Sequence, residues 1–350
     1  MPSVSSLARW IGSRDHIGAS REPRVATLVA SRGAPQPHTL IERCCWIIGV
    51  LASGIAIFLL STLGVAMEIR SLALSLVLMS FLVAIYLVYG KWRPVPVLSN
   101  IGGAIAVLFL SIGTAGVISL VGLRYHSPLI DEALARSDRS LGINLPSIIS
   151  WFADHPALSE LLGFAYDSSF AQLFGLVVLL AFLRRADKLW ELVFVCSLSI
   201  VVSTTISILW PAIGAFAYYD YSADVLEKLP SNAGTYHLAK FEYFRNAASP
   251  VISFANLQGV VTFPSFHCCL ALMTIFAVTG IRWLFWIVAA WNLLVLISTL
   301  PIGGHYVVDL AGGTLLWLAS AALAAILGRE RLRGAILHNR LGAPEAGVAT

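Results

Sequence analysis

The stretch IGGAIAVLFLSIGTAGVISLVGL, residues 101–123, decides the class of fold. It contains no charged residue along its whole length, and a helix needs about 20 apolar residues to cross the hydrocarbon core of a bilayer. Two other runs, 46–67 and 71–89, also lack interior charge. The sequence therefore predicts an all-α protein that crosses a membrane several times.

The composition supports this interpretation. Of the 350 residues, 58% are hydrophobic and 12% are charged, and the mean hydropathy is +0.81. A soluble domain carries about 25% charged residues, so a soluble fold is excluded. The modest net charge of +4 gives no reason to expect a nucleic-acid partner. Five more runs are predicted to span, at 165–183, 189–209, 263–281, 283–300 and 306–327, which makes about eight transmembrane helices.

The distribution of basic residues predicts the orientation. With the N-terminus inside, sixteen of the 23 Lys and Arg residues fall on the inner side and seven on the outer side. Cytoplasmic loops carry the excess of Lys and Arg, so both termini are predicted to be cytoplasmic. Segments 124–164 and 210–262 then lie outside, and their mixture of aromatic and polar residues favours interfacial helices. The five cysteines show neither a disulfide framework nor zinc-ligand spacing.

Two polar stretches interrupt the apolar pattern. In VTFPSFHCCLALM, 261–273, His267 opens a predicted span, and in STLPIGGHYVVDLAGG, 298–313, His305 opens another. Asp309 lies four residues after His305, so a carboxylate one turn along can orient that imidazole. The Gly303–Gly304 pair provides N–H groups at a helix start, where anions bind readily.

The predicted topology brings the two histidines together. The sixth and seventh spans form a hairpin, so His267 and His305 lie at the same depth on the same outer face. Ionisable groups at membrane depth are candidates for a functional site. Metal binding by both histidines and Asp309 is an alternative, but we rank it below acid–base chemistry because no further ligand is evident. We predict no metal and no cofactor.

These residues resemble two signatures of the type 2 phosphatidic acid phosphatase (PAP2) superfamily. FPSFH, 263–267, is similar to the second signature, usually PSGH, and Ser298 to Asp309 matches the spacing of the third, SRxxxxxHxxxD. The resemblance covers about residues 100–327 and implies a six-helix core with a His-His-Asp site at the membrane surface. Two N-terminal helices are an addition here.

The resemblance also implies a role for each residue. His305 is the nucleophile that forms a phosphohistidine, Asp309 orients it, and His267 is the general acid and then the base. Ser265 and nearby backbone amides hold phosphate oxygens, and Gly304 belongs to this set. The implied organisation is a basic tail at 1–45, two extra helices at 46–100, a catalytic domain at 101–328 and a second tail at 329–350.

Departures from the superfamily pattern carry information about the branch. The first signature, KxxxxxxRP, is absent, and Phe266 and Thr299 replace the Gly and the Arg of the other two. Lys240 and Arg245 could supply the missing positive charge. Three features resemble the inositol phosphorylceramide synthase, or inositolphosphotransferase, branch of the superfamily. They are the bulky residue in the second signature, HYxxDxxxG at 305–313, and WPAIGAFAYYD at 210–220.

The sequence therefore predicts a membrane enzyme that moves a phosphoryl or phospho-alcohol headgroup from a membrane lipid to a lipid acceptor. A phosphatase that uses water as the acceptor, with phosphatidic acid or a polyprenyl pyrophosphate as substrate, is the first alternative. A transporter and an inactive scaffold are weaker alternatives. We expect the site on the periplasmic or luminal side, with a bacterial inner membrane as the expected location.

Overall fold

The structure is a computed structural model, and it describes residues 40–341, with the side chains of 329–341 excepted. Six of the helices in this part of the chain are long and apolar enough to cross a membrane. They are α2 (Leu40–Leu63), α3 (Ile69–Leu87), α4 (Pro96–Gly122), α7 (Pro156–Phe182), α8 (Ala186–Leu209) and the first part of α14 (Val307–Leu341). The predicted all-α polytopic membrane fold is confirmed.

The sixth and seventh predicted spans form shorter helices than expected. They are α12 (Phe266–Ala277) and α13 (Arg282–Ser298). At 1.5 Å per residue, the 12 residues of α12 cover only about 18 Å. The chain is not yet helical at 263–265, and Gly280, with φ +90°, lies in the turn that separates the two helices. The hairpin that the sequence predicts is therefore present, but α12 alone is too short to span.

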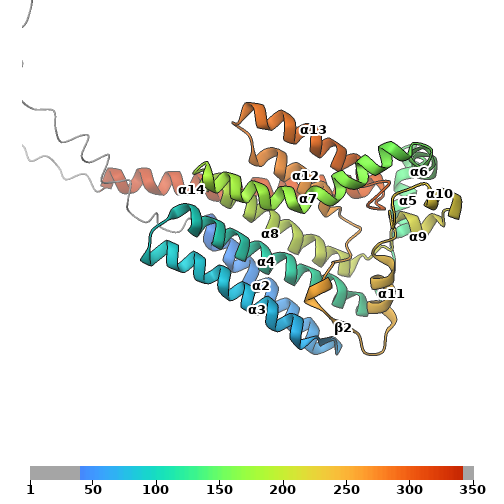
Figure 1. Ribbon diagram of the computed structural model, residues 1–350, viewed down its shortest axis with the longest axis horizontal. Helices are drawn as coiled ribbons and strands as arrows, with labels where there is room; N and C mark the ends of the chain where they lie inside the picture. Colours follow the sequence, from blue (N-terminus) through green and yellow to red (C-terminus); the bar gives the residue numbers. More distant parts are fainter. Residues whose placement is uncertain (1–39, 342–350) are drawn as a thin grey trace, which may run out of the picture. The chain divides into compact units, whose positions relative to one another are not determined.

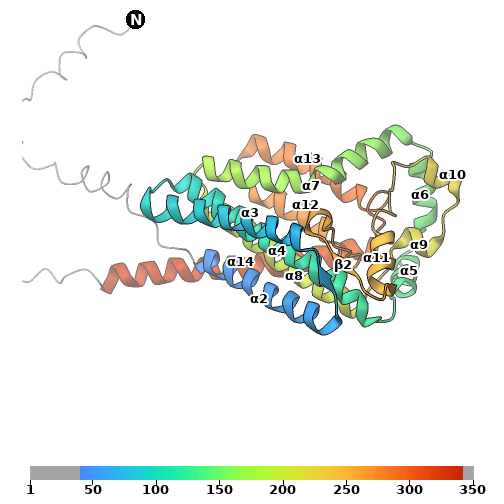
Figure 2. The same cartoon turned by 60° about the horizontal axis from the view of Figure 1, so that its bottom comes forward.

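The segments predicted to lie outside fold mainly into short helices gathered at one end of the bundle (Figure 1). These are α5 (Asp131–Ser140), α6 (Leu145–Ala153), α9 (Ala215–Tyr219), α10 (Ala223–Glu227) and α11 (Leu238–Asn246). The turned view places them at the same end (Figure 2). Two-residue strands, β1 (Ala66–Met67) and β2 (Val251–Ile252), pair in parallel and join the α2–α3 turn to the second of these segments. We call this end of the bundle, 124–155 and 210–262, the cap.

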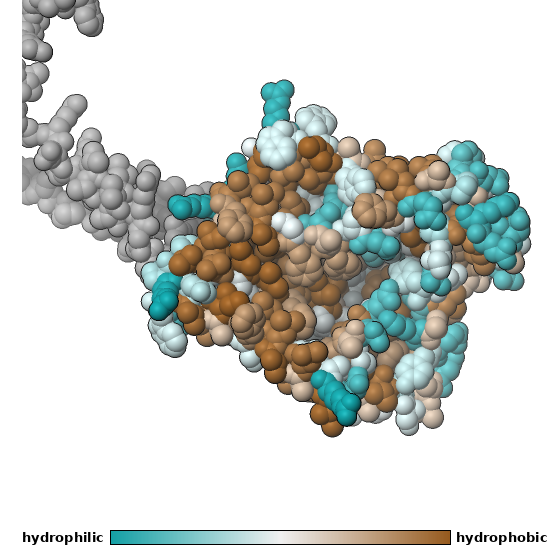
Figure 3. Space-filling model, in the orientation of Figure 1, coloured by the Kyte–Doolittle hydropathy of each residue, from teal (hydrophilic) through white to brown (hydrophobic). Residues whose placement is uncertain are grey.

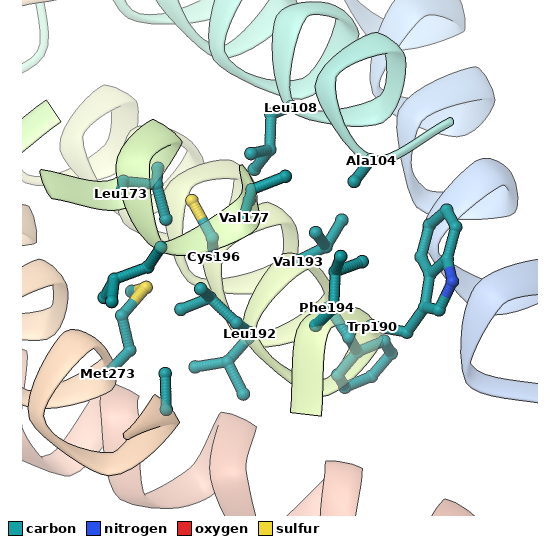
Figure 4. Close-up of a cluster of buried hydrophobic side chains, with 14 of the residues drawn as sticks. Ala104, Leu108, Leu173, Val177, Trp190, Leu192, Val193, Phe194, Cys196 and Met273 are labelled. Carbon is teal, nitrogen blue, oxygen red and sulfur yellow. The ribbon is translucent and has the colours of Figure 1, made fainter. Parts of the chain in front are cut away.

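Helix α8 lies at the centre of the bundle and packs against α2, α4, α7, α12 and α14. Its buried Trp190, Val193 and Phe194 meet Leu108 of α4 and Val177 of α7 in one apolar cluster (Figure 4). Cys196 and three other cysteines belong to or pack against this cluster, and all five cysteines of the chain are free. They serve as small apolar residues.

Glycines in the stretch that predicted the fold allow close helix packing. A Cβ at Gly102 would come within 2.7 Å of Ile85, and one at Gly103 within 2.7 Å of Tyr86. Small residues at helix contacts let backbones approach closely, and van der Waals packing drives association inside a bilayer. The outward face is apolar along the helices, and hydrophilic side chains gather over the cap (Figure 3).

The ends of the described chain differ from the prediction. Helix α2 begins at Leu40, earlier than the expected start at residue 46. Helix α14 continues to Leu341, so 329–341 is helical and not an irregular tail. The reason is composition, because RERLRGAILHNRL is rich in Arg, Leu, Glu and Ala, which favour helix. The rest of the two predicted tails, 1–39 and 342–350, lies outside the described residues.

Candidate active site

His305 and the carboxylate of Asp309 lie close together at the beginning of α14. His305 lies two residues before the helix, and its Nδ1 is 3.2 Å from Oδ2 of Asp309. The same Oδ2 accepts the backbone N–H of Tyr306 at 2.9 Å. Both partners are almost inaccessible, with 2% of the His305 surface and none of Asp309 exposed. The contact therefore fixes the imidazole ring in a dry environment.

Ser265 joins this pair to the beginning of α12. Its Oγ is 3.2 Å from Nε2 of His305, and it accepts the N–H of Cys268 at 3.3 Å as the helix N-cap. Its own N–H donates to the backbone oxygen of Asp309 at 3.0 Å. Gly313 makes this approach possible, because a Cβ there would collide with the Ser265 carbonyl. The two polar stretches of the sequence are thus held together directly.

The hydrogen-bond network assigns the tautomer of His305. A carboxylate only accepts, so Nδ1 carries the proton and donates to Asp309. The unprotonated Nε2 then accepts from the Ser265 hydroxyl, which is free to donate because its oxygen already accepts from Cys268. An imidazole in this state has an electron pair on Nε2, and that atom can act as a nucleophile.

His267 is oriented by two tyrosines, Tyr166 and Tyr236. Nδ1 of His267 is 3.1 Å from the hydroxyl of Tyr166, which is 2.9 Å from that of Tyr236. The ring of Tyr166 also stacks on His267, with centroids 4.1 Å apart, and Phe170 stands edge-on to the same imidazole at 6.1 Å. Burial raises the pKa of Tyr236, so its hydroxyl keeps its proton. When Nδ1–H of His267 donates to the Tyr166 hydroxyl, Nε2 is free to accept a proton and later to return it.

Gly303 lies close to the rings of both Tyr166 and His305. A Cβ at this residue would come within 3.0 Å of the Tyr166 ring and 3.1 Å of the His305 ring. Tyr166 is in turn stacked on His267, so its ring connects the surroundings of Gly303 with those of His267. Within the described residues, no three His, Cys, Asp or Glu side chains are grouped as a metal ion would require.

Two aspartates that sequence reasoning missed hold the site from the cap. Asp138 of α5 accepts the N–H groups of Val307 and Val308, both at 2.9 Å. Asp131, seven residues earlier, accepts the Tyr306 hydroxyl at 3.0 Å and backbone N–H groups of the 211–214 loop. Both carboxylates are buried. Asp138 therefore caps α14 from another helix, as a charged group at a helix N-terminus should.

The capping of α14 by Asp138 changes the prediction that anions bind at the helix start after Gly303 and Gly304. The first-turn donors of α14 are taken by Asp138, so that helix start is not an open anion site. Gly304, with φ +73°, accepts the Ala215 N–H through its oxygen. Its own N–H has no hydrogen-bond partner among residues 40–341. This donor, directly before His305, is available to a substrate oxygen.

The two cations proposed for the phosphate have partners elsewhere. Lys240 donates to Asn256 O at 2.8 Å and to Gln258 at 3.1 Å, and Arg245 donates to Ser127 O at 3.0 Å. Burial lowers the pKa of Lys240. Across the described part of the chain, no Lys or Arg side chain makes a hydrogen bond or ion pair with His267, His305 or Asp309. Phosphate binding by Lys240 or Arg245 stays a prediction.

A third histidine supports the cap beside the site. His237 is 5% exposed, and its Nε2 is 2.7 Å from the Ile213 oxygen. An ideal Cβ at Gly214 would lie 3.4 Å from both this imidazole and the Gly304 oxygen. Burial lowers the pKa of His237 below its ordinary value, although the hydrogen bond to Ile213 opposes this shift. The neutral ring therefore packs against the loop that precedes His305.

A comparison with known families agrees with this geometry. Residues 132–323 match the family model of the PAP2 superfamily, a segment that runs from α5 into α14 and contains His267, His305 and Asp309. The chain belongs to the PAP2 superfamily. PAP2 enzymes are generally phosphatases or phosphotransferases that act on lipid phosphoesters. No curated protein and no solved structure matches the chain.

The PAP2 match does not include the first three membrane helices. It begins at residue 132, so α2, α3 and α4 lie before the matched segment. Yet α4 packs extensively against α8, and the ordered bundle includes all three helices. The match identifies the superfamily and not the branch within it.

Proposed function

We propose that this PAP2 protein is a lipid phosphotransferase of the inositolphosphotransferase type, which transfers a phosphoryl or phospho-alcohol group through His305. One observation carries the proposal. Asp309 lies 3.2 Å from Nδ1 of His305, Ser265 contacts Nε2 of the same ring, and His267, two residues after Ser265, has the Tyr166 hydroxyl beside its own Nδ1. A nucleophile, its orienting acid and a second acid–base group form a sufficient set for phosphoryl transfer.

In the first step, Nε2 of His305 attacks phosphorus and the bond from phosphorus to the leaving oxygen breaks. His267, protonated on both ring nitrogens at this point with Nδ1–H donating to the Tyr166 hydroxyl, gives its Nε2 proton to that oxygen as it leaves and becomes neutral. In the second step, the hydroxyl of the acceptor attacks phosphorus, the bond to His305 breaks, and His267 takes the acceptor's proton. We assign the binding of phosphate oxygens to the Gly304 N–H and to the Ser265 hydroxyl, which turns from Nε2 of His305 to the phosphate as that atom attacks. Asp309 stabilises the imidazole throughout.

The polar character of the site favours a phosphodiester donor over a phosphomonoester. A phosphomonoester carries close to two negative charges at neutral pH, whereas a phosphodiester carries one. No described Lys or Arg contacts the catalytic residues, so little fixed positive charge is available for a dianion. Hydroxyl and amide donors are adequate for a monoanion. This contrast supports transfer of a phospho-alcohol headgroup, with hydrolysis of phosphatidic acid or a polyprenyl pyrophosphate as the alternative.

We also propose that the cap and the site face the periplasm or lumen, with both termini cytoplasmic. The sixteen-to-seven distribution of basic residues supports this orientation. A transporter is less well supported, because the buried polar groups between α7 and α13 are neutral and bonded to one another. Asn292, for example, donates to Gln172 at 2.9 Å and accepts from Thr274 at 3.0 Å.

The proposal is tested with the purified protein, its His305→Ala and His267→Ala variants, and His155→Ala as a matched control on the cap surface. Phosphatidylinositol with ceramide and phosphatidic acid alone are the two substrate sets, and products are followed by mass. We expect a new phosphodiester lipid in wild type and control that both site variants fail to make. Free phosphate from phosphatidic acid as the sole product would establish the phosphatase. Turnover that survives in His305→Ala would exclude this nucleophile.

A further inference from the structure

A mainly apolar cavity that two arginines also line lies at the end of the bundle opposite the histidines. It has a volume of about 500 Å³ and lies between the C-terminal turn of α7, the start of α8 and the α12–α13 turn. Its polar lining is two guanidinium groups, Arg185 and Arg282, and its walls include Leu179, Leu183 and Trp283. Because α12 runs from His267 toward this turn, about 18 Å of helix separates the cavity from the active site.

The two arginines lack a counter-charge. Within the described residues, neither side chain makes an ion pair or a hydrogen bond, although the neighbouring Lys188 pairs with Glu191 at 2.8 Å. The guanidinium of Arg185 lies against the α12–α13 turn, since a Cβ at Gly280 would be 3.2 Å from its Nη1. Two positive groups lining one cavity repel each other unless an anion lies between them.

The surroundings of the cavity are those of a bilayer interface. Trp283 and Trp286 are 69% and 67% exposed at this end of α13, and tryptophan is enriched where headgroups meet acyl chains. Arginine forms paired hydrogen bonds with phosphate. Leucine and tryptophan walls suit the first carbons of acyl chains. A cavity of about 300–1,000 Å³ is the usual size for a small ligand.

We infer that this cavity binds the phosphate of an anionic phospholipid, with Arg185 and Arg282 on the headgroup and the apolar walls on the acyl chains. The lipid comes from the leaflet opposite the active site, which in the proposed orientation is the cytoplasmic leaflet. It is a bound partner of the fold and not a substrate, because the histidines are at the other end of the bundle. The inference does not depend on which reaction the histidines catalyse.

The test compares lipid binding to the full-length protein by native mass spectrometry, with phosphatidylglycerol and phosphatidylcholine as the probes. The Arg185→Gln/Arg282→Gln protein is set against Arg184→Gln/Lys188→Gln, which removes the same charge from the same end but from residues that do not line the cavity. Charge-assisted hydrogen bonds contribute at least about 1.5 kcal/mol. We therefore expect the cavity variant to lose its preference for phosphatidylglycerol by about tenfold or more, and the control to keep it.

Two further measurements use a charge-conserving variant and a soluble competitor. Arg185→Lys/Arg282→Lys keeps the charge and should bind with intermediate preference, which separates headgroup recognition from a failure to fold. Soluble glycerol phosphate should not displace the lipid. Equal loss of preference in the cavity and control variants would mean that general surface charge attracts the lipid. That result would overturn the assignment. So would displacement of the lipid by glycerol phosphate, or a wild-type protein that binds phosphatidylglycerol and phosphatidylcholine equally well.

Discussion

Replacing Asp138 by alanine should loosen the beginning of α14 and with it the orientation of His305. The Asp138 carboxylate is fully buried and accepts two backbone N–H groups at 2.9 Å, those of Val307 and Val308. Hydrogen bonds to a charged group contribute about 1.5–3 kcal/mol each, and loss of a helix cap alone costs about 0.5–2 kcal/mol. Because both valines are half-buried, water can replace part of the loss. We expect destabilisation of about 2–4 kcal/mol.

The structure also supplies two controls for this variant. Asp138→Asn keeps one carbonyl acceptor and should lose about half as much stability as Asp138→Ala. Arg136→Gln breaks an ion pair with Glu132 on the same helix, but both side chains are about 70% exposed. An exposed pair contributes at most about 1 kcal/mol, so this variant should unfold almost like wild type.

The assay is unfolding of the detergent-solubilised protein by increasing dodecyl sulfate, combined with hydrogen exchange of the amides at 307–309. We expect faster exchange at these three residues in Asp138→Ala, and unchanged exchange there in Arg136→Gln. If Asp138→Ala unfolded within about 0.5 kcal/mol of wild type, below the least cost of losing a cap, the capping role assigned to this carboxylate would be refuted. Loss of stability without faster exchange at 307–309 would also contradict it.

Three other predictions concern the surroundings of the site. Tyr166→Phe removes the hydroxyl 3.1 Å from His267 but keeps the stacked ring, so kcat should fall about 10–100-fold with the melting temperature unchanged; an unaltered kcat would contradict the orienting role. Burial lowers the pKa of His237 from about 6.5, so below that pH the unfolded chain takes up a proton at this residue more readily than the folded protein does. The folded protein therefore loses stability as the pH falls below about 6.5 and keeps it above that value. His237→Gln should flatten this part of a stability–pH curve measured by thermal unfolding. Asn292→Leu leaves Gln172 and Thr274 without their partner and should cost about 1–2 kcal/mol in the dodecyl sulfate titration, with catalysis retained.

The membrane helices could be predicted because each is a long apolar run, and hydrocarbon excludes any other arrangement of the backbone. The contact of Ser265 with His305 agrees with the predicted parity of the spans, since a hairpin returns the chain to the same side. Helix ends were harder to place. The apolar run at 263–281 predicted a full span, whereas Ser265 and the turn at Gly280 confine α12 to 12 residues.

The supporting residues of the site could not be found in the sequence. Asp131 and Asp138 lie in DEALARSDRS among Glu132, Arg136 and Arg139, where a carboxylate normally points into solvent. Their partners beside His305, Tyr306 and Val307, are 175 and 169 residues away in the chain. The only available signal was their spacing of seven, which places both on one helix face. Tyr166 was equally hidden, because a tyrosine in an apolar helix gives no sign that it contacts an imidazole.

The most direct test of the central claim is to trap the covalent intermediate on His305. A p-nitrophenyl phosphoester has a leaving group that needs no proton, so His267→Ala should still permit the first step while slowing the second. After an alkaline quench that preserves phosphohistidine, peptide mass spectrometry should find the adduct on His305 in this variant. His267→Ala/His305→Ala should carry none. An adduct on another residue, or turnover of the ester by the double variant, would contradict the account.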